Sequence, residues 1–148
     1  MAHGAKMLIV VALTGCGAFV ACGTEVRDVS GAWSGNDPHT MLTASEVVQL
    51  VLQQNGGILV GKACLVEDGF LVFSGAPVTG SYPDVAFTVQ ASNVQPCCTG
   101  FAGTSFHGSF NGPGNALNGS FGGSSNPDDQ YTLTRASEGS CQGARTVP

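Results

Sequence analysis

Charged residues are scarce in this sequence, and basic residues are the scarcest of all. Charged side chains make up 10% of the 148 residues, against about 25% in an ordinary soluble domain. The five basic residues are scattered along the chain: Lys6, Arg27, Lys62, Arg135 and Arg145. A surface that binds nucleic acid needs clustered Lys and Arg, and the net charge here is -5, so we expect no nucleic-acid partner.

The motifs of the common enzyme classes are also missing. The sequence has no G-x-S-x-G nucleophile elbow, no H-E-x-x-H zinc motif, no P-loop and no dinucleotide-binding fingerprint. His107 falls on the polar side of a predicted strand, where we expect it to be solvated. His39, beside Asp37, and the pair Asp128-Asp129 fall in predicted turns or loops. We therefore expect no enzyme activity, no metal site and no cofactor.

Glycine, in contrast, is abundant, with 22 residues, and it favours short strands joined by tight turns over helices. Val48, Leu50 and Leu52 alternate with polar residues, and the Asn-Gly-Gly after them predicts a hairpin turn. A competing signal is Thr43-x-x-Glu46, which has the spacing of a helix capping box. The alternation and the valines in this window favour a strand.

Further strands are predicted around residues 69–75, 78–92 with a turn near Pro83-Asp84, 103–110, 117–121 and 131–135. About eight short antiparallel strands indicate an all-β domain, either a small up-and-down barrel or a β-sandwich. Nine apolar residues are expected to face its interior, either as a packed core or as the lining of a pocket. They are Val48, Leu50, Leu52, Phe87, Val89, Phe106, Phe110, Leu117 and Phe121.

A three-residue pattern bears on the choice between barrel and sandwich. Gly31-Ala32-Trp33 on the first strand, with Arg135 at the end of the last, resembles the pattern of the calycins, which include lipocalins and avidins. The resemblance implies that Arg135 packs across Trp33 and closes one end of a barrel, a cation–π contact of about 0.5–2 kcal/mol. The alternative is that Trp33 is simply a core residue of a β-sandwich.

The N-terminus has the layout of an export signal. Lys6 is followed by fifteen uncharged residues and then Cys22, an apolar run shorter than the roughly 20 residues of a membrane span. Both LTGC, ending at Cys16, and FVAC, ending at Cys22, resemble the lipobox of a bacterial lipoprotein signal. That resemblance implies diacylglycerol attachment to the cysteine, cleavage just before it, and anchoring to a membrane of the cell envelope. We expect the anchor to lie either in the outer membrane or on the extracytoplasmic face of the cell membrane.

Cys16 matches the lipobox consensus more closely, but three observations favour Cys22. A signal ending at Cys16 would have an apolar core of nine residues and would leave the apolar segment GAFVA beside the membrane. It would also leave Cys22 as an odd thiol, which exported proteins usually avoid. The predicted organisation is a signal peptide at 1–21, a lipid-anchored tether at 22–29, a β domain at 30–136 and a tail at 137–148 pinned by Cys141.

Four cysteines remain in the domain: Cys64, Cys97, Cys98 and Cys141. In an oxidising compartment we expect them to form disulfides. A bond between adjacent cysteines would close a strained small ring, and neighbouring side chains on a strand point to opposite faces. We therefore expect Cys97 and Cys98 each to bond outside their own pair, with Cys64 and Cys141 as partners in an order that the sequence leaves open. A metal site fits poorly, because a C-x₂-C pair is missing.

Two functions remain open for this domain. It is a structural or interaction module of the cell envelope, or, as the alternative, a β-barrel that binds a small apolar ligand. A hollow of at least ~300 Å³ lined by the nine interior residues would favour ligand binding, whereas a packed interior would favour the first.

Overall fold

The computed structural model describes most of the predicted β domain. The described residues are 27–36, 46–122, 130–137, 141 and 144–146. The predicted signal peptide, Cys16 and Cys22, His39 with Asp37, and Asp128-Asp129 lie outside the described residues.

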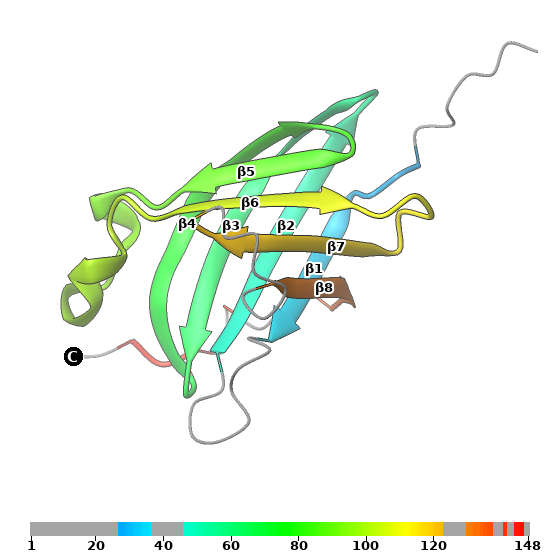
Figure 1. Ribbon diagram of the computed structural model, residues 1–148. Helices are drawn as coiled ribbons and strands as arrows, with labels where there is room; N and C mark the ends of the chain where they lie inside the picture. The colour runs from blue at the N-terminus through cyan, green and yellow to red at the C-terminus, as the bar shows by residue number, and fades with distance from the viewer. Residues whose placement is uncertain (1–26, 37–45, 123–129, 138–140, 142–143, 147–148) are drawn as a thin grey trace, which may run out of the picture.

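Eight antiparallel strands form one closed barrel, in which each strand pairs with its neighbours in sequence and the first pairs with the last (Figure 1). The prediction of an all-β fold is confirmed, and of the two architectures it is the barrel. The strands are β1 (Gly31–Asn36), β2 (Glu46–Asn55), β3 (Ile58–Glu67), β4 (Phe70–Ser81), β5 (Asp84–Thr88), β6 (Ser105–Phe110), β7 (Ala116–Phe121) and β8 (Tyr131–Ala136).

The window with competing helix and strand signals is β2, so the strand prediction is confirmed. All ten of its residues pair with β3, and Gly31–Asn36 pair with it on the other side. Val48, Leu50 and Leu52 point inward and are at most 1% exposed. The strand wins because a period of two places these three side chains in one core, which a helix could not do. Gly56, with a φ of 60°, makes the tight turn into β3.

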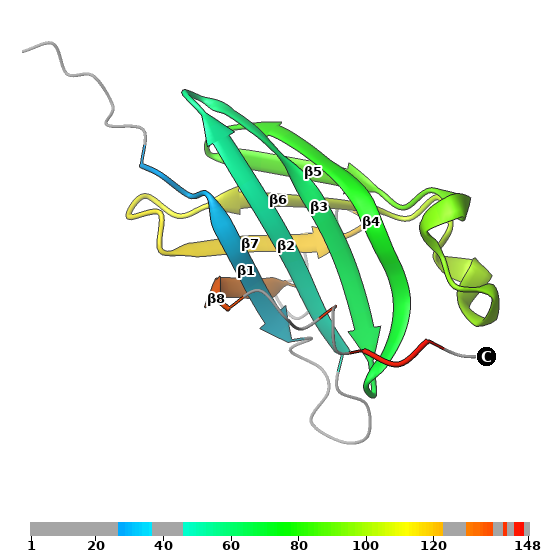
Figure 2. The same cartoon turned by 180° about the vertical axis from the view of Figure 1, so that it is seen from behind.

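The barrel has two different ends. At the closed end the chain enters β1, and the short turns β2–β3, β4–β5 and β6–β7 lie there. At the opposite end, the loop end, lie the β3–β4 turn and the β5–β6 connection. That connection holds two short 3-10 helices, η1 (Ala91–Asn93) and η2 (Pro96–Phe101), which project from the barrel (Figures 1 and 2).

β4 is longer than expected. The sequence predicted a strand at 69–75 and a separate one from residue 78, but Phe70–Ser81 is continuous. Its pairing with β3 shifts register between Ala63 and Val66, and Gly75 has a φ of 70°. An irregularity of this kind bends a strand without ending it, which is how one strand follows the curve of a small barrel.

Side chains fill the interior of the barrel. Eight of the nine predicted interior residues are at most 4% exposed, and the ninth, Phe121, is partly buried against them. One group of aromatic rings lies in the half nearer the loop end: the Phe106 ring lies 5.1 Å from that of Phe87 and 5.2 Å from that of Phe121, centroid to centroid. Phe73 contacts the same group. All nine residues belong to one cluster of hydrophobic side chains in mutual contact, so they form a packed core.

Candidate functional site

The closed end is sealed by Trp33 and Arg135, which face each other in the β1–β8 register. The guanidinium carbon of Arg135 lies 4.5 Å from the centre of the Trp33 ring, and the indole N–H donates to the backbone oxygen of Val29 at 2.8 Å. The rings of Trp33 and Phe110 meet in a T-shaped contact, with centroids 4.8 Å apart. The contact that the calycin resemblance implied is therefore present, and it fixes the chain where it enters the barrel.

Arg135 also holds the residues that precede β1. Its two terminal nitrogens donate to the backbone oxygens of Ser30 and Asp28. Hydrogen bonds from the Ser30 side chain and backbone N–H, with the nearby Arg135 charge, hold the pKa of the Asp28 carboxyl below its ordinary value of 3.8. Val29, placed in the tether by the sequence, is fully buried, so packing of the barrel begins one residue before the predicted boundary.

The predicted disulfide pattern is wrong. Cys64 is bonded to Cys141, with their Cα atoms 6.3 Å apart, and Cys97 is bonded to its neighbour Cys98. The argument against an adjacent bond assumed a strand, in which neighbouring side chains diverge. Both residues lie instead in η2, where Cys98 has φ -123° and ψ 28° and interrupts the helix, so the alternation of a strand does not apply.

The Cys64–Cys141 bond fastens the C-terminal tail across the outside of the barrel. Cys64 points outward from β3, and the cluster around it contains Val66, Leu71, Cys141 and Ala144. Gln49 on β2 donates to the Ser137 backbone oxygen and accepts from the Cys141 backbone N–H, both at 3.3 Å. The tail is thus pinned by Cys141, as the sequence predicted. The partner of Cys141 is Cys64, however, and not Cys97 or Cys98.

After Cys141 the tail reaches the β3–β4 turn. The Leu71 N–H donates to the Arg145 backbone oxygen, and the Arg145 N–H donates to the Gly69 backbone oxygen, both at 2.9 Å. With the cluster around Cys64, these bonds place the tail over the loop-end part of the outer face, next to Gln49, Cys64 and Leu71.

One hollow, of about 520 Å³, lies at the loop end. It is open to solvent and lined by Glu67, Cys97, Cys98, Gly100, Phe101 and Thr104. Its chemistry is mixed, with one carboxylate, one disulfide and one aromatic ring. None of the nine predicted interior residues lines it.

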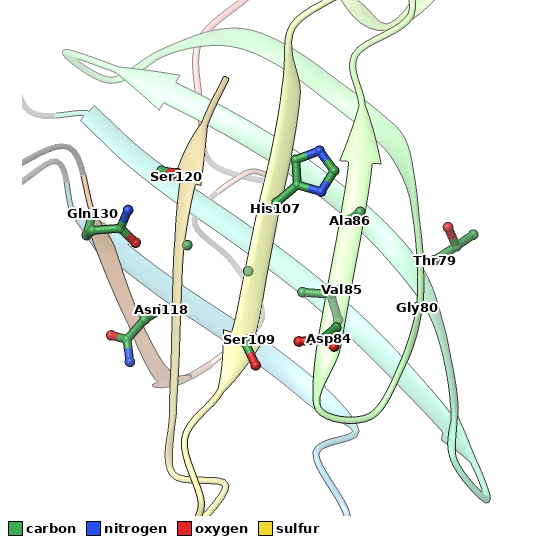
Figure 3. A pocket seen from close by; sticks show the side chains of 12 residues that line it. Thr79, Gly80, Asp84, Val85, Ala86, His107, Ser109, Asn118, Ser120 and Gln130 are labelled. Atoms are coloured by element: carbon green, nitrogen blue, oxygen red, sulfur yellow. The ribbon is translucent and has the colours of Figure 1, made fainter. Parts of the chain in front are cut away.

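A second hollow, of about 470 Å³, lies on the outer face of β4 to β7 (Figure 3). Polar residues line it together with glycines, Val85 and Ala86. The outward-facing residues of these strands form rows that extend beyond the hollow. One row runs Thr79, Ala86, His107 and Ser120, and the next runs Ser81, Asp84, Ser109, Asn118 and Thr132. The asparagine of the second row accepts a hydrogen bond from the threonine at 2.9 Å. On this face Thr79, His107 and Asn118 are exposed, whereas Ser120 is buried.

The polar hollow suits hydrogen bonding better than catalysis. His107 is exposed, as the sequence predicted, and Asp84 stands in the neighbouring row, on a different strand. Cross-strand diagonal neighbours lie about 7–8 Å apart, too far for a direct acid–base pair without the reach of long side chains. Lys, Arg, Phe, Tyr and Trp are not among the residues that line it.

Three further features concern only the described residues. Among them, no three His, Cys, Asp or Glu side chains gather as they would around a metal ion. The same part of the chain contains no helix with the length and hydropathy needed to span a bilayer. Every buried polar side-chain atom there has a hydrogen-bond partner.

Comparison with known proteins found no counterpart: no protein-family model, no curated protein and no solved structure matches this chain.

Sequence reasoning missed both hollows. The polar rows were visible only as Ser105, His107 and Ser109 alternating with apolar residues, a pattern that any half-solvated strand shows. The rows on β6 and β7 become one surface only when the register places Ser109 opposite Asn118 and His107 opposite Ser120.

Proposed function

We propose that this chain is a lipid-anchored protein of the cell envelope whose barrel is an interaction module with a filled interior. The proposal combines the lipobox-type N-terminus with the domain that follows it. The attachment residue is Cys22, with Cys16 as the alternative, and the anchor places the domain on the outer membrane or on the extracytoplasmic face of the cell membrane.

The Cys64–Cys141 bond is the observation that carries this proposal. Stable disulfides belong to oxidising compartments and are rare in the cytosol of mesophiles. A domain with its tail fastened by such a bond suits a chain that is exported, and a lipobox suits one that then stays at a membrane.

The filled core favours an interaction module over the alternative of a barrel that binds a small apolar ligand. Phe87, Phe106 and Phe121 occupy the space that such a ligand would need. Partners would then meet the outside of the barrel, where the polar hollow of β4 to β7 offers many hydrogen-bonding groups on rigid strands.

Intact-mass measurement of the protein from membranes tests the anchor. We expect a chain that begins at Cys22 and carries diacylglycerol, and palmitate label that disappears in Cys22→Ala but persists in the matched variant Cys16→Ala. Loss of label in Cys16→Ala alone would move the anchor to Cys16. An unacylated N-terminus in the untreated protein would end the lipoprotein proposal.

A further inference from the structure

The distance between the proposed anchor and the barrel is short. Val29 is fully buried, and its N–H donates to the Gln54 side chain at 2.8 Å, so the barrel holds the chain firmly from this residue onward. Val29 lies seven positions after Cys22 in the sequence. At no more than about 3.6 Å per residue, a fully extended tether reaches roughly 25 Å. A lipid on Cys22 would therefore keep the closed end near the bilayer.

The closed end also carries the most exposed large apolar side chain of the described residues. Ile58, the first residue of β3, is 61% exposed, and Val60, two residues further, is 46% exposed. The β2–β3 hairpin lies beside the point where the chain enters the barrel (Figures 1 and 2). Gln54 of this hairpin is hydrogen-bonded to the entering chain: its side-chain oxygen accepts from the Val29 N–H, and its backbone N–H donates to the Ser30 hydroxyl at 3.0 Å. The apolar tip and the tether thus leave the barrel at the same end.

The distribution of charged residues also favours the closed end as the end that faces the membrane. Among the described residues, the loop end carries Glu46, Glu67 and Asp68 against Arg145. The closed end balances Arg27 and Arg135 against Asp28 and Asp84. Membranes rich in anionic lipid repel a carboxylate-rich surface, so the loop end is the less favourable of the two to face a bilayer.

We propose that the closed end is a membrane-contact surface: the barrel stands on a phospholipid bilayer with the Ile58 tip in the headgroup region and the loop end pointing away. This inference rests on the lipid anchor proposed above. It assigns the Cys97–Cys98 hollow to the side that faces away from the membrane, accessible to partners there.

Tryptophan quenching in vesicles tests this orientation. The variants are Ile58→Trp at the closed end and the matched control Phe70→Trp at the loop end, where the native side chain is 41% exposed. Each is prepared as the full-length lipidated protein in phosphatidylcholine vesicles with brominated acyl chains. The native Trp33 is fully buried and gives a constant background, measured in the unsubstituted protein. An interfacial side chain reaches about 5–10 Å into the headgroup and acyl boundary, so we expect about a twofold loss of the added emission for Ile58→Trp and none for Phe70→Trp.

The outcomes separate this inference from the lipoprotein proposal. If mass measurement shows the lipid on both variants and neither tryptophan is quenched, or both are quenched equally, the orientation is wrong and the anchor stands. If mass measurement shows no lipid on the protein, the lipoprotein proposal fails. The orientation, which rests on the anchor, fails with it, and we then expect no quenching of Ile58→Trp. Both substitutions replace exposed side chains, and unchanged urea unfolding would verify that each variant folds.

Discussion

Arg135 connects three parts of the closed end through one side chain. Its guanidinium covers the Trp33 ring, and it donates to the backbone oxygens of Asp28 and Ser30. We expect Arg135→Met to lower the free energy of unfolding by about 1–2 kcal/mol, because an exposed cation–π contact and two partly solvated hydrogen bonds are lost. Urea denaturation monitored by Trp33 fluorescence measures this change.

Arg145→Met is the matched control for that substitution. Arg145 is also exposed, and the bonds described for it come from its backbone. Its replacement should change stability by no more than about 0.5 kcal/mol. Equal effects of the two variants would show that Arg135 contributes nothing specific at the closed end.

Gly119 on β7 lies directly against the Phe106 ring of β6, so a substitution there tests how tightly the aromatic core is packed. A Cβ atom added there would overlap the Phe106 ring and lie 2.6 Å from the backbone oxygen of His107. We expect Gly119→Ala to destabilise the protein by about 1–3 kcal/mol, because the core has no room to move the ring. Gly112→Ala, where nothing lies within 4 Å of the added atom, should be close to neutral in the same thermal or urea unfolding experiment.

At the scale of elements, the two disulfides make an unequal pair. Cys64 and Cys141 are 77 residues apart in sequence, whereas Cys97 and Cys98 are adjacent. The stabilisation that a disulfide gives through the unfolded chain grows with the loop it closes, to about 4.5 kcal/mol for a loop of this length. We expect the double variant Cys64→Ala/Cys141→Ala to lose about 2–4 kcal/mol in urea denaturation, since measured values fall below the entropic limit.

The Cys97–Cys98 bond closes almost no loop. The matched variant Cys97→Ala/Cys98→Ala should therefore lose about 1 kcal/mol or less of unfolding free energy. A larger loss of stability for this variant than for Cys64→Ala/Cys141→Ala would contradict the view that the Cys64–Cys141 bond is the more stabilising of the two.

The elements differ in how far the sequence predicted them. Most strands were predictable because they carry a local signal: alternation in β2, and the turn at Pro83 between β4 and β5. The continuity of β4 through Gly75 was not predicted. The Trp33–Arg135 contact was predictable from a resemblance. The disulfide pairing was not, because it depends on where the tail crosses the barrel, and no local pattern encodes that path. The same is true of the polar hollow, whose rows exist only through the strand register.

At the scale of the whole molecule, the filled interior makes a clear prediction about ligands. The barrel core is closed by the contacts among Phe73, Phe87, Phe106 and Phe121. A fluorescent fatty acid added to the delipidated domain should therefore show no saturable binding in the micromolar range, because entry would require displacement of packed rings. Saturable binding at one site, weakened by a bulkier residue at Leu117, would instead favour the ligand-binding alternative.

The closure of the barrel by its first and last strands has a consequence for biosynthesis. β1 pairs with β8 through Ala32, Trp33 and Ser34, and β8 is the last strand to be made. A chain emerges from the ribosome N-terminus first, at about 5–20 residues per second. Until β8 is available, β1 and β7 each keep a bare edge that could zip onto another copy. Folding therefore cannot be completed until Tyr131–Ala136 has joined the sheet: a chain truncated just before Tyr131 would keep an open, adhesive sheet.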